Sequence, residues 1–297
     1  MKTWANGVKK LKFGYQTVRW GWGRVANIFP QVLDEISEAG FAAIEANDVD
    51  VVPFLGDGRK FSEMLSERGI KLVGLDIFSL DSLLLGPLSR YASFHRINKF
   101  MKFAASVECE KFVLGGPVSA VAREEVSEKI YAKLSKAWNR IGKECVDLHL
   151  EASFHPVVES IGTTPAQLNK LLELTDPDLI NLTVDTGHLA IAGINPLEVI
   201  KNYPDRIVHV HLKDVKGGIF AELGEGTDIN IPEVMKSLRL VGYDDWVIVE
   251  DEVIDNAPPL SILGRTTRLP LETAKRSKKY IENLMKSDFM TKNPKDE

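Results

Sequence analysis

The chain has few of the features that would assign it to several common classes of protein. It contains only two cysteines among 297 residues, Cys109 and Cys145, and neither belongs to a CxxC motif. A disulfide framework is therefore not expected, and Cys145, near the end of a predicted helix, is expected to be a buried structural thiol. No apolar run reaches about 18 residues, and charges interrupt the opening MKTWANGVKKLKFGY where a signal peptide would be apolar. We expect a soluble, cytoplasmic protein that does not enter a membrane.

Positive charge is also scarce. The formal net charge is −5, from 37 Lys and Arg against 42 Asp and Glu. Because no block of basic residues occurs, we do not expect a surface for nucleic acid phosphates. The Gly-rich turn of a dinucleotide-binding fold is missing too, since RWGWGRVANIF, not GxGxxG, follows the first apolar run. The expected partner is a small molecule, and a homo-oligomer is left open.

What the chain has is a regular alternation of short apolar runs with amphipathic segments. Eight runs are predicted as strands: residues 11–18, 41–46, 70–78, 110–116, 146–152, 179–185, 206–212 and 246–250. Helical patterns such as FPQVLDEISEAG follow them, and no linker-like stretch intervenes. Two helix starts are marked by a capping residue before a proline, at Thr164 and at Asn195. The pattern predicts an α/β fold with a single (β/α)8 TIM barrel over residues 1–297, with a loose tail from about residue 286.

The last four predicted strands each end in a side chain that can bind a metal ion. These side chains are Glu151, Asp185, His211 and Glu250. Because active sites lie at the carboxyl ends of barrel strands, they are expected to meet at one point. Three close carboxylates repel one another, and a divalent cation relieves this repulsion. The donor set suits Mn²⁺ or Co²⁺, with Mg²⁺ and Zn²⁺ as alternatives. For any single acid, a helix cap or a solvated loop residue is the simpler interpretation.

Other polar side chains near these strand ends are candidates for a substrate pocket. His209 shares a strand face with His211 but lies two residues deeper, so we expect it to be a hydrogen-bonded residue beneath the site. Trp20 is predicted either to pack on a sugar ring or to belong to the core. Glu45 is expected to bind a hydroxyl group or to form a structural salt bridge. Lys213 is expected to reach an anionic group of the substrate or to form part of the turn.

Four segments resemble the xylose isomerase-like TIM barrels, which include sugar phosphate isomerases and epimerases, ketose 3-epimerases and inosose dehydratases. They are VDTGHLAIAG (184–193), RIVHVHLKDV (206–215), ELGEGTDINIPEVMKSL (222–238) and YDDWVIVEDE (243–252), and the resemblance covers nearly the whole chain. It implies the same four metal ligands. It also implies that Glu151 and Glu250 act as acid and base, and that His188 contacts the substrate near its carbonyl. In the dehydratase branch a His-rich stretch follows strand five, and His155 and Glu159 could partly replace it.

Both branches of this family begin with the same chemical step. A carboxylate removes the proton α to a carbonyl, and the metal stabilises the resulting enediolate. Return of a proton from a second acid gives isomerisation or epimerisation, whereas loss of a β-hydroxyl gives dehydration, with His188 and His155 as the candidate acids. We predict a metal-dependent isomerase or epimerase of a keto-sugar or its phosphate, with an inosose dehydratase as the alternative. An AP endonuclease or a non-catalytic carbohydrate-binding barrel fits these residues less well.

Overall fold

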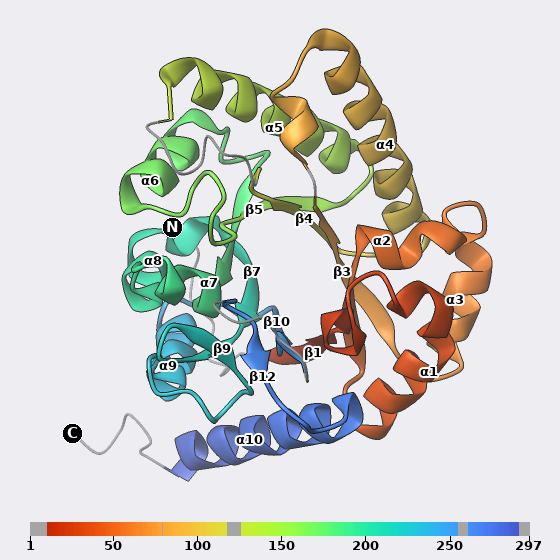
Figure 1. Cartoon of the computed structure of the whole chain (residues 1–297), viewed down its shortest axis with the longest axis vertical. Helices are drawn as coiled ribbons and strands as arrows, with labels where there is room; N and C mark the ends of the chain where they lie inside the picture. Colours follow the sequence, from red (N-terminus) through yellow and green to blue (C-terminus); the bar gives the residue numbers. More distant parts are fainter. Residues whose placement is uncertain (1–10, 79, 118–125, 255–260, 291–297) are drawn as a thin grey trace.

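The chain folds into a closed barrel of eight parallel strands surrounded by helices (Figure 1). The computed structural model describes residues 11–78, 80–117, 126–254 and 261–290. Around the barrel the strands follow the order β1, β10, β7, β6, β5, β4, β3, β2. Their bounds are β1 Lys12–Gln16, β2 Ala43–Asn47, β3 Lys71–Ile77, β4 Lys111–Gly115, β5 Glu151–His155, β6 Asn181–Asp185, β7 Ile207–Leu212 and β10 Trp246–Val249. The predicted (β/α)8 barrel is confirmed.

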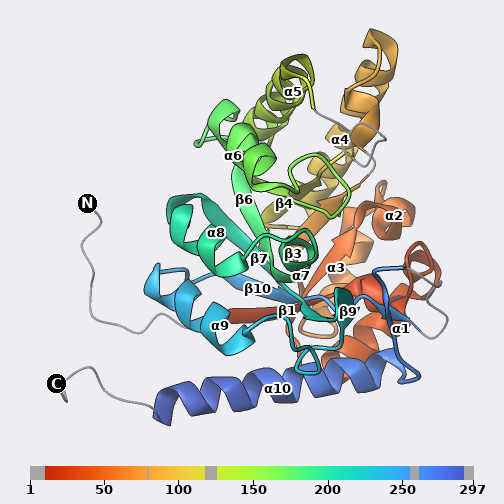
Figure 2. The ribbon, with the colours of Figure 1, turned by 60° about the vertical axis from the view of Figure 1, so that its left-hand side comes forward.

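An outer layer of helices covers the barrel. The longer helices are α1 Val25–Glu38, α3 Gly58–Ser66, α4 Pro87–Ser106, α5 Glu128–Asp147, α6 Pro165–Leu174, α8 Pro196–Asn202, α9 Ile231–Leu240 and α10 Pro270–Met290. Two short helices follow the carboxyl ends of strands, α2 Asp48–Val51 and α7 Thr186–Ile191. Figure 2 shows α10 running along the outside of the barrel, beside α1. No helix in the described part of the chain is long and apolar enough to cross a membrane.

Local sequence signals explain where several helices begin and which face they bury. The Thr164 hydroxyl accepts a hydrogen bond from the Gln167 amide at 3.2 Å, and the Asn195 side chain accepts one from Leu197 at 3.0 Å, as expected of caps before proline. Helix α5 buries residues at helical spacing, among them Trp138 and the free thiol of Cys145. Helix α10 continues to residue 290, past the predicted start of the tail, and residues 291–297 lie outside the described part.

The fifth strand lies later in the sequence than predicted. Helix α5 continues to Asp147, and the chain then turns through His149, which has a positive φ of 60°. The amides of Leu148 and Leu150 both donate to the Cys145 carbonyl at 2.9 Å, which closes the helix. Strand β5 therefore begins at Glu151, close to where the predicted strand 146–152 was to end. In VDLHLEA only the last two residues belong to the strand, and the rest is a helix end and a turn.

Two small sheets extend the carboxyl end of the barrel. Strands β8 (Asp214–Lys216) and β9 (Ile219–Ala221) form an antiparallel hairpin directly after β7. Strands β11 (Val253–Ile254) and β12 (Gly264–Arg265) pair after β10. The hairpin brings Phe220 over Lys213, with the ammonium 4.9 Å from the ring centroid. The Phe220 ring also contacts His188, with ring centroids 5.1 Å apart, so the hairpin covers part of the polar centre described below. The loop between β11 and β12 includes residues 255–260, which lie outside the described part.

Candidate active site

Three of the predicted metal ligands meet at the carboxyl end of the barrel. Asp185 ends β6, His211 lies near the end of β7, and Glu250 follows β10. His211 Nδ1 lies 3.0 Å from Glu250 Oε2 and 3.5 Å from Asp185 Oδ2. Asp185 also caps α7, because its Oδ1 accepts the His188 amide at 2.7 Å. This bond leaves Oδ2 to face the other two groups.

Glu151, the fourth predicted ligand, does not belong to this cluster. It is the first residue of β5, so it lies at the opposite end of the barrel, where the parallel register pairs it with Lys111. Its side chain is 54% exposed and forms an ion pair with Lys111, whose ammonium also lies 2.6 Å from Asp245 Oδ2. The predicted position of Glu151 at the carboxyl end is wrong, and the geometry gives it no part as a metal ligand or as the catalytic partner of Glu250.

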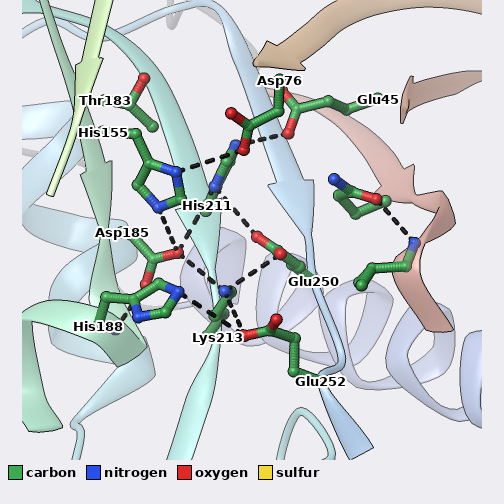
Figure 3. A network of polar contacts seen from close by, with 12 residues as sticks. Glu45, Asp76, His155, Thr183, Asp185, His188, His211, Lys213, Glu250 and Glu252 are labelled. Carbon is green, nitrogen blue, oxygen red and sulfur yellow. Dashed lines mark hydrogen bonds and ion pairs between the residues drawn. The ribbon is translucent and has the colours of Figure 1, made fainter. Parts of the chain in front are cut away.

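His155 occupies the place at the end of β5 that Glu151 was expected to fill. Its Nε2 lies 3.3 Å from Asp185 Oδ2, and its ring lies 4.6 Å from that of His211 at an interplanar angle of 80°. Figure 3 shows the two imidazoles side by side between two sets of carboxylates, with Asp185 and Glu250 on one side. The prediction assigned His155 to substrate binding, whereas the structure brings it among the possible metal ligands. The cluster thus offers two carboxylates and two imidazoles.

Lys213 supplies a positive charge next to this cluster. Its side chain is buried, and its ammonium lies 3.3 Å from Asp185 Oδ2, 3.1 Å from Glu250 Oε1 and 2.8 Å from Glu252 Oε2. Burial lowers the pKa of Lys213, but the three carboxylates outweigh burial and raise it above its ordinary range. Burial would likewise raise the pKa of Glu250, but Lys213 and His211 hold it below its usual range. The cluster is held together by opposite charges.

His188 faces the same centre as a neutral imidazole. Its Nδ1 accepts the Val158 amide at 3.1 Å, so the ring proton is assigned to Nε2, which lies 3.7 Å from Glu252 Oε2. Burial, and then the charge of Lys213, hold the pKa of His188 well below its ordinary value. An imidazole of this kind can donate a hydrogen bond to a substrate oxygen, which agrees with the predicted contact near a carbonyl.

The residues fit a divalent metal ion. Donor atoms of Asp185, His211 and Glu250 all lie within 4.8 Å of one another. His211 Nδ1 and Glu250 Oε2 are buried and lie 3.0 Å apart, but neither makes a hydrogen bond of good geometry, although buried polar atoms are normally paired. A cation between them would satisfy both atoms. Mixed imidazole and carboxylate donors suit Mn²⁺, Co²⁺ and Zn²⁺.

Two predicted substrate contacts lie elsewhere. Glu45 is fully buried beneath the cluster, where its two carboxylate oxygens face His209 and His211, which corresponds to the structural salt bridge. His209 is buried there, as expected from its deeper place in the strand. Trp20 belongs to the core: its Nε1 donates to Glu35 Oε2 at 2.7 Å and its exposed fraction is 8%. In the structure Glu45 and Trp20 thus occupy the structural position that was left open as an alternative for each.

The sequence interpretation missed two acids of the site. Asp76, in β3, is fully buried with its Oδ2 3.3 Å from His155 Nδ1, and burial raises its pKa to about 6. Glu252 follows Glu250 by two residues, and burial raises its pKa too. A signal for Asp76 was present, because an acid inside the apolar run LVGLDIF has to find a partner in the barrel. Glu252 carried only the weaker signal of a second acid in VEDE.

Comparison with known proteins adds an independent line of evidence. A sequence profile of the xylose isomerase-like TIM barrel matches residues 33–277. An inosose dehydratase of Geobacillus kaustophilus is 28% identical over 285 residues, which cover 86% of this chain and 87% of that protein. An inosose dehydratase of Clostridium tetani is 33% identical over 175 residues, 52% of this chain and 55% of that protein.

Solved structures agree with the fold. A sugar phosphate isomerase/epimerase from Parabacteroides distasonis superposes with a TM-score of 0.69 at 18% identity, and covers 94% of this chain and 96% of its own. An L-ribulose 3-epimerase gives a TM-score of 0.77 at 16% identity, with 96% and 99% covered. At these identities the likeness concerns the fold alone.

Proposed function

The chain belongs to the xylose isomerase-like TIM barrel family, and from that premise we propose that it is a metal-dependent lyase that removes water from a keto-polyol of the inosose class. The observation that carries the proposal is the position of Glu151. Epimerisation through two glutamates needs one on each face of the substrate, and Glu151 lies at the far end of the barrel from Glu250. The similarity to inosose dehydratases, which extends over most of the chain, supports the same choice.

Asp185, His211, Glu250 and His155 would hold the metal. A divalent ion bound there would polarise the substrate carbonyl and make the adjacent hydrogen more acidic. His188, as a neutral imidazole with a proton on Nε2, is suited to donate a hydrogen bond to the developing enolate oxygen. These residues therefore prepare the substrate for loss of a proton.

Glu252 is the carboxylate best suited to remove that proton. Its pKa is raised by burial, whereas the pKa of Glu250 is held low, and a base with a pKa closer to the working pH is more effective. Once protonated, Glu252 would give this proton to the departing β-hydroxyl, which leaves as water, so Glu252 returns to its carboxylate form and the step balances. Lys213, 2.8 Å from Glu252, would stay charged and hold Glu252 in place.

Epimerisation or isomerisation is the second candidate, because it shares the proton abstraction. It differs in that the proton returns to carbon and the hydroxyl stays. The deciding experiment incubates the protein and Mn²⁺ or Co²⁺ with inososes, ketoses and ketose phosphates in D₂O, and follows product mass and deuterium. We expect an inosose to lose one water and the ketoses to remain unchanged. Retained mass with deuterium next to the carbonyl would support the second candidate, and no change in any substrate would refute both.

A matched pair of variants tests the assignment of residues. Glu252→Gln removes the proposed base, and we expect kcat to fall about 10²–10⁴-fold. Glu151→Gln makes the same change at the other end of the barrel and should leave kcat and metal affinity within twofold of wild type. If Glu151→Gln lost activity while Glu252→Gln kept it, the proposed site would be wrong.

A further inference from the structure

Two buried carboxylates beneath the cluster have no part in the steps above. Glu45 in β2 and Asp76 in β3 are both 0% exposed. Figure 3 shows them on the side of His155 and His211 opposite to Asp185 and Glu250. Each of the two imidazoles is thus placed between a carboxylate at the candidate metal centre and one behind it.

Glu45 contacts two histidines with its two oxygens. Its Oε1 lies 2.7 Å from His211 Nε2, and its Oε2 lies 2.5 Å from His209 Nε2. With Nε2 turned toward Glu45, only Nδ1 of His211 is left to face Glu250 and Asp185. The partner on one ring nitrogen decides which nitrogen is free to bind a metal. Glu45 therefore selects Nδ1 of His211 as the donor atom.

The barrel is built to leave room for this carboxylate. The register between β2 and β3 shifts at Glu45, which brings it opposite Gly74. A Cβ atom at position 74 would lie only 2.3 Å from Glu45 Oε2. A residue with any side chain there would force the carboxylate to move, so the glycine is required by the close approach.

Asp76 stands in the same relation to His155. Its Oδ2 lies 3.3 Å from His155 Nδ1, and His155 Nε2 then faces Asp185 Oδ2 at 3.3 Å. Asp76 lies two residues after Gly74 in β3, so both residues face the barrel interior. Strand β3 thus supplies both Gly74, which leaves space for the carboxylate of Glu45, and Asp76, the second carboxylate behind the histidines.

We propose that Glu45 and Asp76 are positioning residues that fix the ring orientation and the donor nitrogen of His211 and His155 for the metal. The inference rests on the proposed metal centre and says nothing of which reaction follows. Neither residue touches the substrate. Loss of such a partner behind a metal-binding histidine typically weakens metal binding 10–100-fold.

The test measures Co²⁺ binding by calorimetry and the visible absorption of bound Co²⁺, without substrate. Glu45→Gln and Asp76→Asn should each bind Co²⁺ about 10–100-fold more weakly, with a shifted absorption band. Gly74→Ala keeps the charge of Glu45 but displaces its carboxylate, so it should produce the same defect. Glu222→Gln is the matched control, because Glu222 is also buried but pairs with Arg268, at 2.7 Å, instead of with a histidine. It should bind Co²⁺ as the wild type does.

Wild-type affinity and absorption in both Glu45→Gln and Gly74→Ala would overturn the inference. An equal loss in Glu222→Gln would overturn it too, since a general loosening of the fold would then explain the effect. If Glu45→Gln fails to fold, Gly74→Ala alone decides. A wild-type protein that binds Co²⁺ but converts no inosose refutes the proposed function and leaves this inference standing, whereas one that binds no divalent ion refutes both.

Discussion

Asp50 lies in α2, the short helix that follows β2, and its ionisation lowers the free energy of unfolding by an amount that can be measured. Its side chain is fully buried, and its Oδ2 accepts hydrogen bonds from Thr17 Oγ1 at 3.0 Å and from Asn47 Nδ2 at 3.3 Å. Its Oδ1 has no partner. Burial raises the pKa of Asp50 to about 6. In Asp50→Asn the amide oxygen can keep both accepted bonds, and no charge remains to be buried.

The change in pKa sets the size and sign of the effect. An aspartate in the unfolded chain has a pKa of about 3.9, so between about pH 4 and pH 6 the folded protein binds more protons at this site than the unfolded chain. The free energy of unfolding of the wild type therefore falls as the pH rises through this range. With about 1.36 kcal/mol per pH unit, the loss from Asp50 reaches about 3 kcal/mol by pH 7. Asp50→Asn lacks this loss.

The assay is equilibrium urea unfolding of the wild type and Asp50→Asn at several values between about pH 4 and pH 7. Only the difference between the two proteins is needed, because other titrating groups cancel in it. We expect the variant to gain about 2 kcal/mol on the wild type between the two ends of the range, because a small part of the loss is already present at pH 4. A difference that does not change with pH would mean that Asp50 titrates normally in the fold, and would refute the reasoning from burial.

Three further substitutions test the surroundings of the site. In Gly187→Ala the new Cβ would lie 2.6 Å from Lys213 Cβ and 3.0 Å from Phe220 Cε1. We therefore expect the free energy of unfolding, measured in urea, to fall by about 1–3 kcal/mol and KM to rise. Lys213→Met leaves the three carboxylates around it without their counter-charge, so the free energy of unfolding of the metal-free protein should fall by about 3–5 kcal/mol. Saturating Mn²⁺ should recover part of the resulting drop in melting temperature. Trp20→Phe removes the bond to Glu35 and should cost about 1 kcal/mol with no change in KM; a raised KM would return Trp20 to the substrate pocket.

The sequence predicted most of the fold because its signals there are local. Asp185 and His211 each stand at the end of an apolar run that is a strand in the structure, and Thr164 and Asn195 cap helices by bonds within a few residues. Such signals lie within a few neighbouring residues, so they can be recognised without knowing the strand register or which side chains are buried. The barrel could also be inferred from the number of strand–helix units alone.

The prediction failed where a local pattern has two interpretations. Alternation in VDLHLEA is equally compatible with a strand and with the last turn of α5 followed by a reversal at His149. Tertiary packing decides between them, because Cys145 and Trp138 share the buried face of α5. Because the predicted strand five lay too early in the sequence, the prediction placed Glu151 at the carboxyl end of the barrel, where the structure has His155. The histidine partners of Glu45 and Asp76 could not be predicted for another reason: they come from β7 and β5, and only the closed barrel brings these strands close to β2 and β3.

The exchange of Glu151 for His155 changes the electrostatics of the candidate centre. Three carboxylates and one imidazole would leave a divalent ion with a net charge of −1, whereas Asp185, Glu250, His155 and His211 leave it neutral. Fewer anionic ligands withdraw less of the positive charge, so an ion held by this set would polarise a carbonyl oxygen more strongly. Lys213 and Glu252 form an ion pair beside it, which adds a proton acceptor without adding net charge. A centre of this kind would favour the proton abstraction that both candidate reactions share, because negative charge builds up on the carbonyl oxygen in that step.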